Sequence, residues 1–187
     1  MEPSDVVLYV ASKVKLVPGR TSLQKLTYFA NVKLRANVAF RPHYYGPYSS
    51  QIAEVTDNLL SDAFLDEVRE SGSLSSPWVT PGGTVMTDWE RRSYSITDAG
   101  KHYLQRLPLK RLRELRKLDP VLAKLQKDTN LDPKPISNLA KVHFLCQETP
   151  SIRSNIDSIS LAAKGYGWKL TDSDVEGALK TLDSLHI

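Results

Sequence analysis

The strongest constraint on the fold is a glycine–proline pair within the segment HYYGPYSSQI, residues 43–52. Pro47 has no amide proton and biases Gly46 towards extended backbone, so no helix can run through this pair. A serine that follows, Ser49 or Ser50, can cap a new helix. We therefore predict a corner that sets the direction of the next helix. The apolar residues of that helix are Ile52, Val55, Leu59 and Leu60.

The corner is crowded with aromatic side chains, and two roles for them are open. Tyr44, Tyr45 and Tyr48 either pack the corner onto the core or stand exposed. In the functional alternative His43, Tyr45 and Tyr48 line a groove beside the start of the next helix, whose N-terminus attracts anions. Packing is the role we expect. The predicted corner or groove consists of His43, Tyr45, Gly46, Pro47, Tyr48 and Ser49.

The order of elements around the corner predicts a winged helix-turn-helix domain. Apolar periodicity indicates helices at 5–17 and 22–35, the second capped by Thr21 or Ser22. After the third helix come strands at 64–72 and 91–97, separated by a loop at 72–87 that would form the tip of the wing. Thr97 is expected to cap a further helix. The fold class is therefore mainly α with a small β-hairpin, followed by a C-terminal helical segment.

Proline positions divide the second half of the chain. Leucines recur from Leu109 to Leu125 in one or two amphipathic helices, with a break at Asp119-Pro120. The segment 132–135, Asp-Pro-Lys-Pro, is predicted to be a linker between residues 1–130 and a small helical unit at 136–187. That unit either forms a second helix-turn-helix or packs on the first domain as one body. Its last helix is expected to start from Thr171.

The net charge of +4 says little by itself, but the distribution of charge along the chain favours nucleic-acid binding. Residues 101–127 hold nine Lys or Arg against Glu114 and Asp119, a local net charge of +7 that leaves −3 for the rest of the chain. Such a basic stripe is typical of nucleic-acid binders, although a solvated helix face is equally compatible with it. In the third helix Glu54 and Asp57 would repel phosphate. The predicted nucleic-acid contacts are Ser50, Gln51, Asn58, Arg91, Arg92, Lys110, Arg111, Arg113, Arg116 and Lys117.

Two functions therefore compete. In the first, the chain is a regulatory or defence protein that binds double-stranded DNA, with phosphate contacts from the basic stripe. In the second, the leucine stripe from Leu109 to Leu125 is a seam for a homodimer or a protein partner, and the basic residues lie on the outer faces. The mix of charges on the third helix leaves room for the second function.

The segments RTSLQKLTYFANVKL and FRPHYYGPYSSQIAEVTDNLL, together with SYSITDAGKHYL, resemble the YwgA-like family. They are similar, more distantly, to SocA-like (Panacea) antitoxin-type domains. The matching positions are Arg20, Leu23, Gln24, Lys25, Leu26, Phe29, Phe40, Tyr45, Gly46, Pro47, Tyr48 and Ser49. The resemblance spans about residues 5–107 and implies a winged-helix fold. It supplies no catalytic residues, and its antitoxin relatives imply a protein partner.

Nothing in the sequence predicts an enzyme, a cofactor or a metal site. Cys146 is the single cysteine, which suits a reducing cytoplasm and predicts a buried, inert thiol. The four histidines lack the spacing of metal ligands. No apolar run is long enough for a membrane span, so no membrane partner is expected. Trp78 and Trp89 flank the predicted wing tip and would either pin it back or stack on bases.

Overall fold

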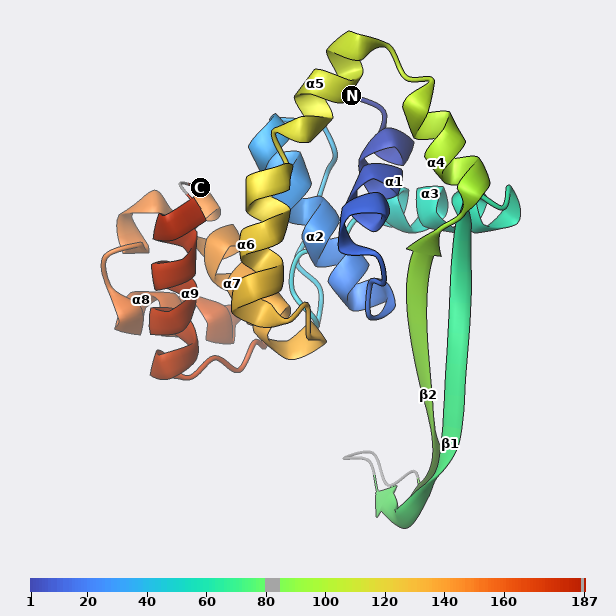
Figure 1. Cartoon of the computed structure of the whole chain (residues 1–187). Helices are drawn as coiled ribbons and strands as arrows, with labels where there is room; N and C mark the ends of the chain where they lie inside the picture. Colours follow the sequence, from blue (N-terminus) through green and yellow to red (C-terminus); the bar gives the residue numbers. More distant parts are fainter. Residues whose placement is uncertain (80–84, 186) are drawn as a thin grey trace.

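The structure, a computed structural model, describes residues 1–79, 85–185 and 187, with the side chains of residues 1–73, 91–185 and 187. It is mainly helical, with one two-stranded antiparallel sheet that projects from the helical body (Figure 1). This confirms the predicted fold class at that level. The elements are α1 (Pro3–Val14), α2 (Gly19–Leu34), α3 (Ser50–Ser61), β1 (Leu65–Val79), β2 (Val85–Ile96), α4 (Asp98–Gln105), α5 (Leu109–Arg116), α6 (Asp119–Thr129), α7 (Pro133–Glu148), η1 (Pro150–Ile152), α8 (Ile156–Gly165) and α9 (Asp172–Leu185).

Helix α1 lies at the centre of the first half, because it is apolar on nearly every side. Val7, Val10 and Ala11 are fully buried, and α1 packs against α2, α3, α4 and α6. Helix α2 begins at Gly19, so the predicted cap at Thr21 or Ser22 is wrong. The hydroxyl of Ser22 instead donates to the carbonyl oxygen of Leu131 at 2.7 Å and joins α2 to the end of α6.

The hairpin is anchored to the helical body at its base. Val17, between α1 and α2, exchanges two backbone hydrogen bonds with Tyr94 of β2, at 2.8 and 2.9 Å. The strands are longer than predicted, because pairing continues through Ser73 with Asp88 and resumes at Trp78 with Met86 after an irregularity. The predicted loop at 72–87 is therefore wrong at both ends. The side chains of Trp78 and Trp89, for which a wing-tip role was predicted, lie outside the described residues.

Capping residues and prolines stand at the starts of the following helices, as the sequence predicts. The hydroxyl of Thr97 accepts a hydrogen bond from the amide of Gly100 and starts α4. Pro108 precedes α5, and Pro120 lies in the first turn of α6. Thr171 caps α9, where its hydroxyl accepts from the amide of Asp174 at 3.1 Å.

The predicted linker at 132–135 is wrong, because these residues start α7 with prolines in its first turn, where no intrahelical amide bond is lost. Helix α7 packs against both α2 and α9. One cluster of buried apolar side chains extends from α1 to α9, and Ile136, Leu139 and Val142 contribute to it from α7. The two predicted regions, 1–130 and 136–187, thus share one core.

Candidate binding site at the tyrosine corner

The segment between α2 and α3 is a closed loop, as the Gly-Pro pair predicts. Arg41 and Tyr48 exchange backbone hydrogen bonds at 2.9 and 2.8 Å, and the amide of Gly46 donates to the carbonyl oxygen of His43 at 2.9 Å. Gly46 has a φ of +94°, a conformation that suits glycine. The hydroxyl of Ser49 then accepts from the amide of Ile52 and caps α3, as predicted.

Two neighbouring residues of α2 hold this corner in place. The side-chain amide of Gln24 donates to the carbonyl oxygen of Ser49 at 3.0 Å and accepts from the amide of Ser49 at 3.1 Å. The ammonium of Lys25 donates to the carbonyl oxygen of Pro47 at 2.7 Å. The two segments that carry the family resemblance therefore meet, because the Gln-Lys pair of α2 satisfies the backbone of the Gly-Pro-Tyr-Ser corner.

Lys25 is buried, with 2% of its surface exposed. Burial, assisted by the nearby charge of Lys141, lowers the pKa of Lys25 to about 7. Among the described residues no carboxylate forms an ion pair with it. The corner thus packs against the side chain of Lys25, whose charged form is destabilised by burial.

The tyrosines of the corner lie outside the core, so the expected packing role is wrong for them. Tyr44, Tyr45 and Tyr48 are 72%, 56% and 36% exposed. The reason lies in Gly46, whose backbone contacts α7 directly: a Cβ at that position would lie 3.4 Å from the carbonyl oxygen of Ser137. The backbone of the corner is therefore the part that packs. His43 is also exposed, and its carbonyl oxygen accepts a hydrogen bond from Nε1 of Trp168 at 2.7 Å.

A pocket of about 500 Å³, which we call the corner pocket, opens beside Tyr44 and Tyr45. Its wall combines the start of α2, the corner, the first half of α7 and the loop between α8 and α9. The lining residues are Thr21, Tyr44, Tyr45, Pro133, Lys134, Ser137, Asn138, Lys141, Gly167, Trp168 and Lys169. Its volume lies in the range of pockets that bind ligands.

The corner pocket is positively charged. Its lining includes Lys134, Lys141 and Lys169 and, among the described residues, no Asp or Glu. None of these lysines forms an ion pair within the described part of the chain. Lys141 lies over the ring of Trp168, 5.8 Å from its centroid, and burial lowers the pKa of Lys141.

One hydroxyl in this pocket lacks a partner. Ser137 is 4% exposed, and its Oγ makes no hydrogen bond in the structure. A buried hydroxyl without a partner costs about 1–3 kcal/mol, so most such groups are satisfied by protein, water or ligand. Ser137 thus places a buried, unsatisfied hydroxyl next to the pocket that its residue helps to line.

The corner pocket adjoins an open hollow of about 410 Å³ at the base of the hairpin, because Thr21 and Pro133 line both. The hollow also contains Arg20 and Arg92. Arg20 donates to the hydroxyl of Tyr94 and pairs with Asp57 of α3. Nη1 of Arg92 lies 3.9 Å from a carboxylate oxygen of Glu67. Arg20 thus joins α2 to the hairpin and to α3, Arg92 interacts within the hairpin, and both arginines already lie beside carboxylates.

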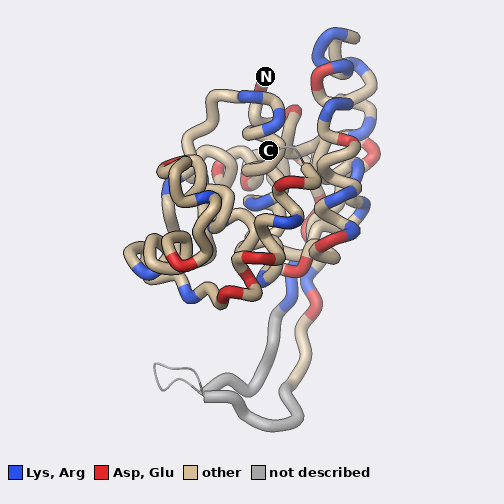
Figure 2. The backbone as a smooth tube through the Cα atoms, turned by 90° about the vertical axis from the view of Figure 1, so that its left-hand side faces the viewer, with Lys and Arg blue, Asp and Glu red and all other residues tan. Residues whose placement is uncertain are grey.

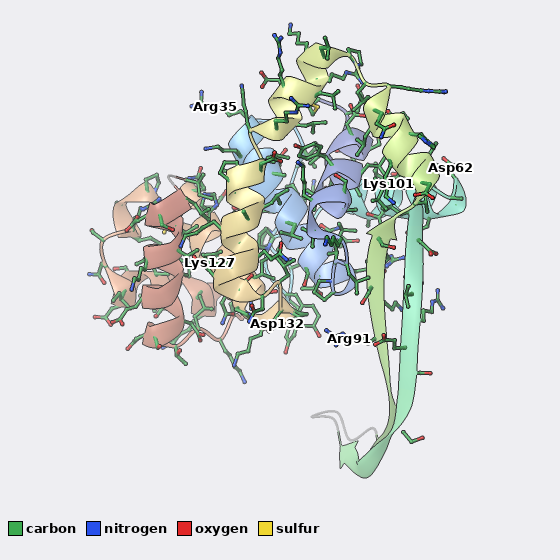
Figure 3. The ribbon with its side chains drawn as sticks, viewed as in Figure 1. Arg35, Asp62, Arg91, Lys101, Lys127 and Asp132 are labelled. Carbon is green, nitrogen blue, oxygen red and sulfur yellow. The ribbon has the colours of Figure 1, made fainter. Side chains whose placement is uncertain are left out.

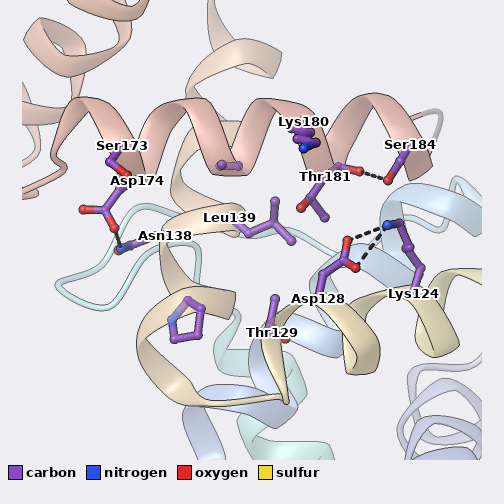
Figure 4. A pocket seen from close by; sticks show the side chains of 13 residues that line it. Lys124, Asp128, Thr129, Asn138, Leu139, Ser173, Asp174, Lys180, Thr181 and Ser184 are labelled. Carbon is purple, nitrogen blue, oxygen red and sulfur yellow. Dashed lines mark hydrogen bonds and ion pairs between the residues drawn. The ribbon is translucent and has the colours of Figure 1, made fainter.

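A second pocket, of about 490 Å³, lies between α6, α7 and α9 (Figure 4). Its polar groups bond to one another: Lys124 pairs with Asp128, and Asn138 donates to Asp174 at 2.9 Å. The hydroxyl of Ser184 donates to the carbonyl oxygen of Thr181. This pocket therefore offers fewer unsatisfied groups to a ligand than the corner pocket does.

The residues predicted to contact nucleic acid do not gather on one surface. Ser50, Gln51 and Asn58 are exposed on α3, but α3 contains Glu54 and Asp57 and no Lys or Arg. Residues 65–96, the hairpin, contain three arginines, Arg91 and Arg92 among them, against five Asp or Glu. The two elements that contact DNA in a winged helix are thus both net negative.

The basic residues of α5 lie elsewhere, at the end of the helical body away from the hairpin tip (Figure 1). Arg111 pairs with the fully buried Asp5, and Lys117 pairs with Glu114, which leaves Lys110, Arg113 and Arg116 without an ion pair among the described residues.

The basic stretch does not form one face of the molecule. Lys101 and Lys127 lie on different sides, and Arg91 lies apart from both on the hairpin (Figure 3). Positive and negative segments alternate along the helices in Figure 2.

The predicted leucine seam is wrong, because its residues belong to the chain's own core. Leu115, Leu118 and Leu125 are fully buried, and Leu122 is 2% exposed. Leu109 remains exposed, at 74%, but it stands at the start of α5. A partner seam along the whole stripe would require α5 and α6 to leave the core.

No protein-family model matches the chain, and no curated protein matches it. The resemblance to the YwgA-like and SocA-like families thus stays a prediction. Among the described residues, no three His, Cys, Asp or Glu side chains gather as a metal site, and no helix is long and apolar enough to cross a membrane. Cys146 is buried, and burial raises the pKa of its thiol.

Proposed function

We propose that this protein is a non-catalytic regulatory module of winged-helix architecture that binds a protein partner through the tyrosine corner. The observation that carries the proposal is the exposure of Tyr44 and Tyr45 on a loop whose backbone is fixed by Gln24 and Lys25. Exposed tyrosines on a rigid support contribute strongly to protein interfaces, since they bury a large surface at low entropic cost.

The winged-helix part of the proposal is supported by the order of elements. Helices α1, α2 and α3 pack together, and the antiparallel hairpin that follows α3 is bonded to the helical body at Val17. In this architecture α3 and the hairpin would contact DNA. Their net negative charge opposes a phosphate backbone, which favours a protein partner over double-stranded DNA. The single buried cysteine suits a reducing cytoplasm.

The experiment compares the chain with a corner variant and a matched surface variant. Tagged wild type, Tyr44→Ala/Tyr45→Ala and Leu109→Ala are used to capture partners, which are quantified by mass spectrometry. Leu109 is as exposed as Tyr44 but lies on α5. We expect one partner that wild type and Leu109→Ala retain equally and the double tyrosine variant loses. Equal capture by all three would refute the role of the corner.

DNA binding through α5 is the second candidate, favoured by the four basic residues against one acidic residue in that helix. It predicts that affinity for a random DNA duplex falls steeply with salt and that Lys110→Ala/Arg113→Ala weakens it. Our proposal predicts no duplex binding at 150 mM salt, roughly physiological ionic strength. Fluorescence anisotropy with a labelled duplex separates the two candidates.

A further inference from the structure

We propose that the corner pocket takes an acidic peptide segment of the partner, with a carboxylate held by Lys134, Lys141 and Lys169. An apolar or aromatic side chain of the same segment would pack on Tyr44 and Tyr45. This inference rests on the proposed function and names the chemistry that the partner must present at that site.

Charge complementarity is the first argument. Three lysines from α7 and from the loop before α9 line the pocket, and none forms an ion pair among the described residues, although the charge of Asp174 acts on Lys134 and Lys141 from α9. Other described cations near carboxylates are paired, as Lys124 with Asp128 and Arg153 with Asp183, whereas these three lysines share one pocket whose lining has no Asp or Glu among the described residues. A carboxylate brought in by a partner would add a counter-charge in direct hydrogen-bonding contact, and hydrogen bonds to charged groups are the stronger ones.

An unpaired hydroxyl beside the lysines also favours a polar ligand group. Ser137 lines the pocket with a buried hydroxyl that has no hydrogen-bond partner. Its Oγ is itself shielded, so it would donate to a carboxylate oxygen after rotation of the Ser137 side chain towards the pocket. Lys141 lies one helical turn further along α7, so both groups are presented by the same rigid element.

The pocket is also held in shape before any partner arrives. Trp168 is 2% exposed, stacks on Tyr166 with ring centroids 5.0 Å apart, and donates to the carbonyl oxygen of His43. The loop before α9 and the corner are therefore tied together across the pocket. Such pre-organisation lowers the entropic cost of binding.

The surroundings favour a peptide over a nucleic-acid strand. A single strand needs a basic groove that follows successive phosphates. Here the three lysines form one local positive site, Arg20 and Arg92 are engaged with carboxylates, and the next turn on α9 begins with Asp172 and Asp174. An isolated carboxylate fits this pattern, whereas a run of phosphates would meet the acidic first turn of α9.

The experiment selects peptide ligands and then tests the carboxylate. A phage library of random 12-residue peptides is panned against the full chain, and the enriched peptides are synthesised with fluorescein. Each is compared with its Asp→Asn and Glu→Gln form by anisotropy. The variants are Lys134→Ala/Lys141→Ala/Lys169→Ala and a control with the same charge change away from the pocket, Lys110→Ala/Lys117→Ala/Lys127→Ala.

We expect enrichment of Asp and Glu beside apolar residues, and affinity reduced on the order of tenfold or more by the amide peptide or by the pocket triple variant. The control triple variant should bind as wild type does. Circular dichroism confirms that both triple variants fold. Zero-length carbodiimide coupling should link the peptide carboxylate to a pocket lysine.

Three outcomes would overturn the inference: no acidic enrichment, equal binding by the pocket and control variants, or displacement of the peptide by the oligonucleotide dT12. The first two leave the proposed function intact if partner capture still depends on Tyr44 and Tyr45. The third, accompanied by loss of that dependence, would refute the proposed function as well.

Discussion

Replacing the buried Lys25 with methionine should remove a specific dependence of stability on pH. The pKa of Lys25 is about 7 in the folded chain, against 10.5 for an ordinary lysine. Between these values the unfolded chain binds a proton that the folded chain does not bind. The free energy of unfolding therefore rises with pH in this window, by about 1.4 kcal/mol per pH unit. Below pH 7 Lys25 is protonated in both the folded and the unfolded chain, so the full free-energy cost of burying its charge remains.

The magnitude follows from these two pKa values. From pH 7.5 to 9.5 the contribution of Lys25 amounts to about 2.5 kcal/mol. Urea unfolding followed by circular dichroism at pH 7.5, 8.5 and 9.5 measures it. The rise of the unfolding free energy with pH should be smaller in Lys25→Met than in wild type by this amount. Lys127→Met, which removes an exposed lysine of α6, should keep the wild-type slope.

Methionine also leaves the carbonyl oxygen of Pro47 without its donor, which lowers the overall stability of Lys25→Met but not its slope. The slope is therefore the readout that isolates the buried charge. Other groups whose pKa values burial shifts, among them Lys141, Cys146 and Tyr94, also contribute to the slope, and they do so in every variant. A slope in Lys25→Met equal to that of wild type would contradict the burial of a titrating ammonium at the corner.

Three further predictions use the same unfolding assay. Gly46→Val should cost about 2 kcal/mol or more, since valine is strained at a φ of +94° and its Cβ would lie 3.1 Å from Cγ of Lys141, while Pro47→Ala should cost about 1 kcal/mol or less; equal costs would refute the account of the corner. Gly100→Ala should cost about 2 kcal/mol or more, because its Cβ would lie 2.4 Å from the carbonyl oxygen of Phe64, whereas Gly177→Ala on α9 meets nothing within 4 Å and should gain about 0.5–1 kcal/mol; a neutral Gly100→Ala would show that α4 does not contact the start of β1. Burial lowers the pKa of His143 to about 4, so the unfolded chain alone gains a proton as pH falls from 7 to 5, and wild type should lose about 2 kcal/mol more than His143→Leu over that range; parallel losses would contradict a buried, neutral imidazole.

The elements that the sequence predicted best are those set by local chemistry. Pro47, Ser49 and Thr97 act on their own neighbours, and each ends or starts an element where predicted. The failures involve partners distant in the chain. Ser22 was predicted to be a cap because nothing in the sequence shows that Leu131 lies beside it. Pro133 and Pro135 are compatible with a linker and with the first turn of a helix. The helix forms because α7 packs against α2, which lies far away in the sequence.

Only the local part of the candidate site could be predicted from the sequence, for the same reason. Gly46 and its flanking aromatic residues indicated a corner, but Lys141 and Trp168 lie about a hundred residues further along the chain, and only packing brings them to it. The local signal from α7 was weak, since one lysine among apolar residues is usual on a helix edge. What distinguishes Lys141 is that the corner packs beside it and its ammonium lies over the ring of Trp168, with no ion pair among the described residues and with only the more distant charge of Asp174 to favour its charged form. A cation in this position would gain stability from a carboxylate, and the binding site that we propose therefore follows from how α2 and α7 pack.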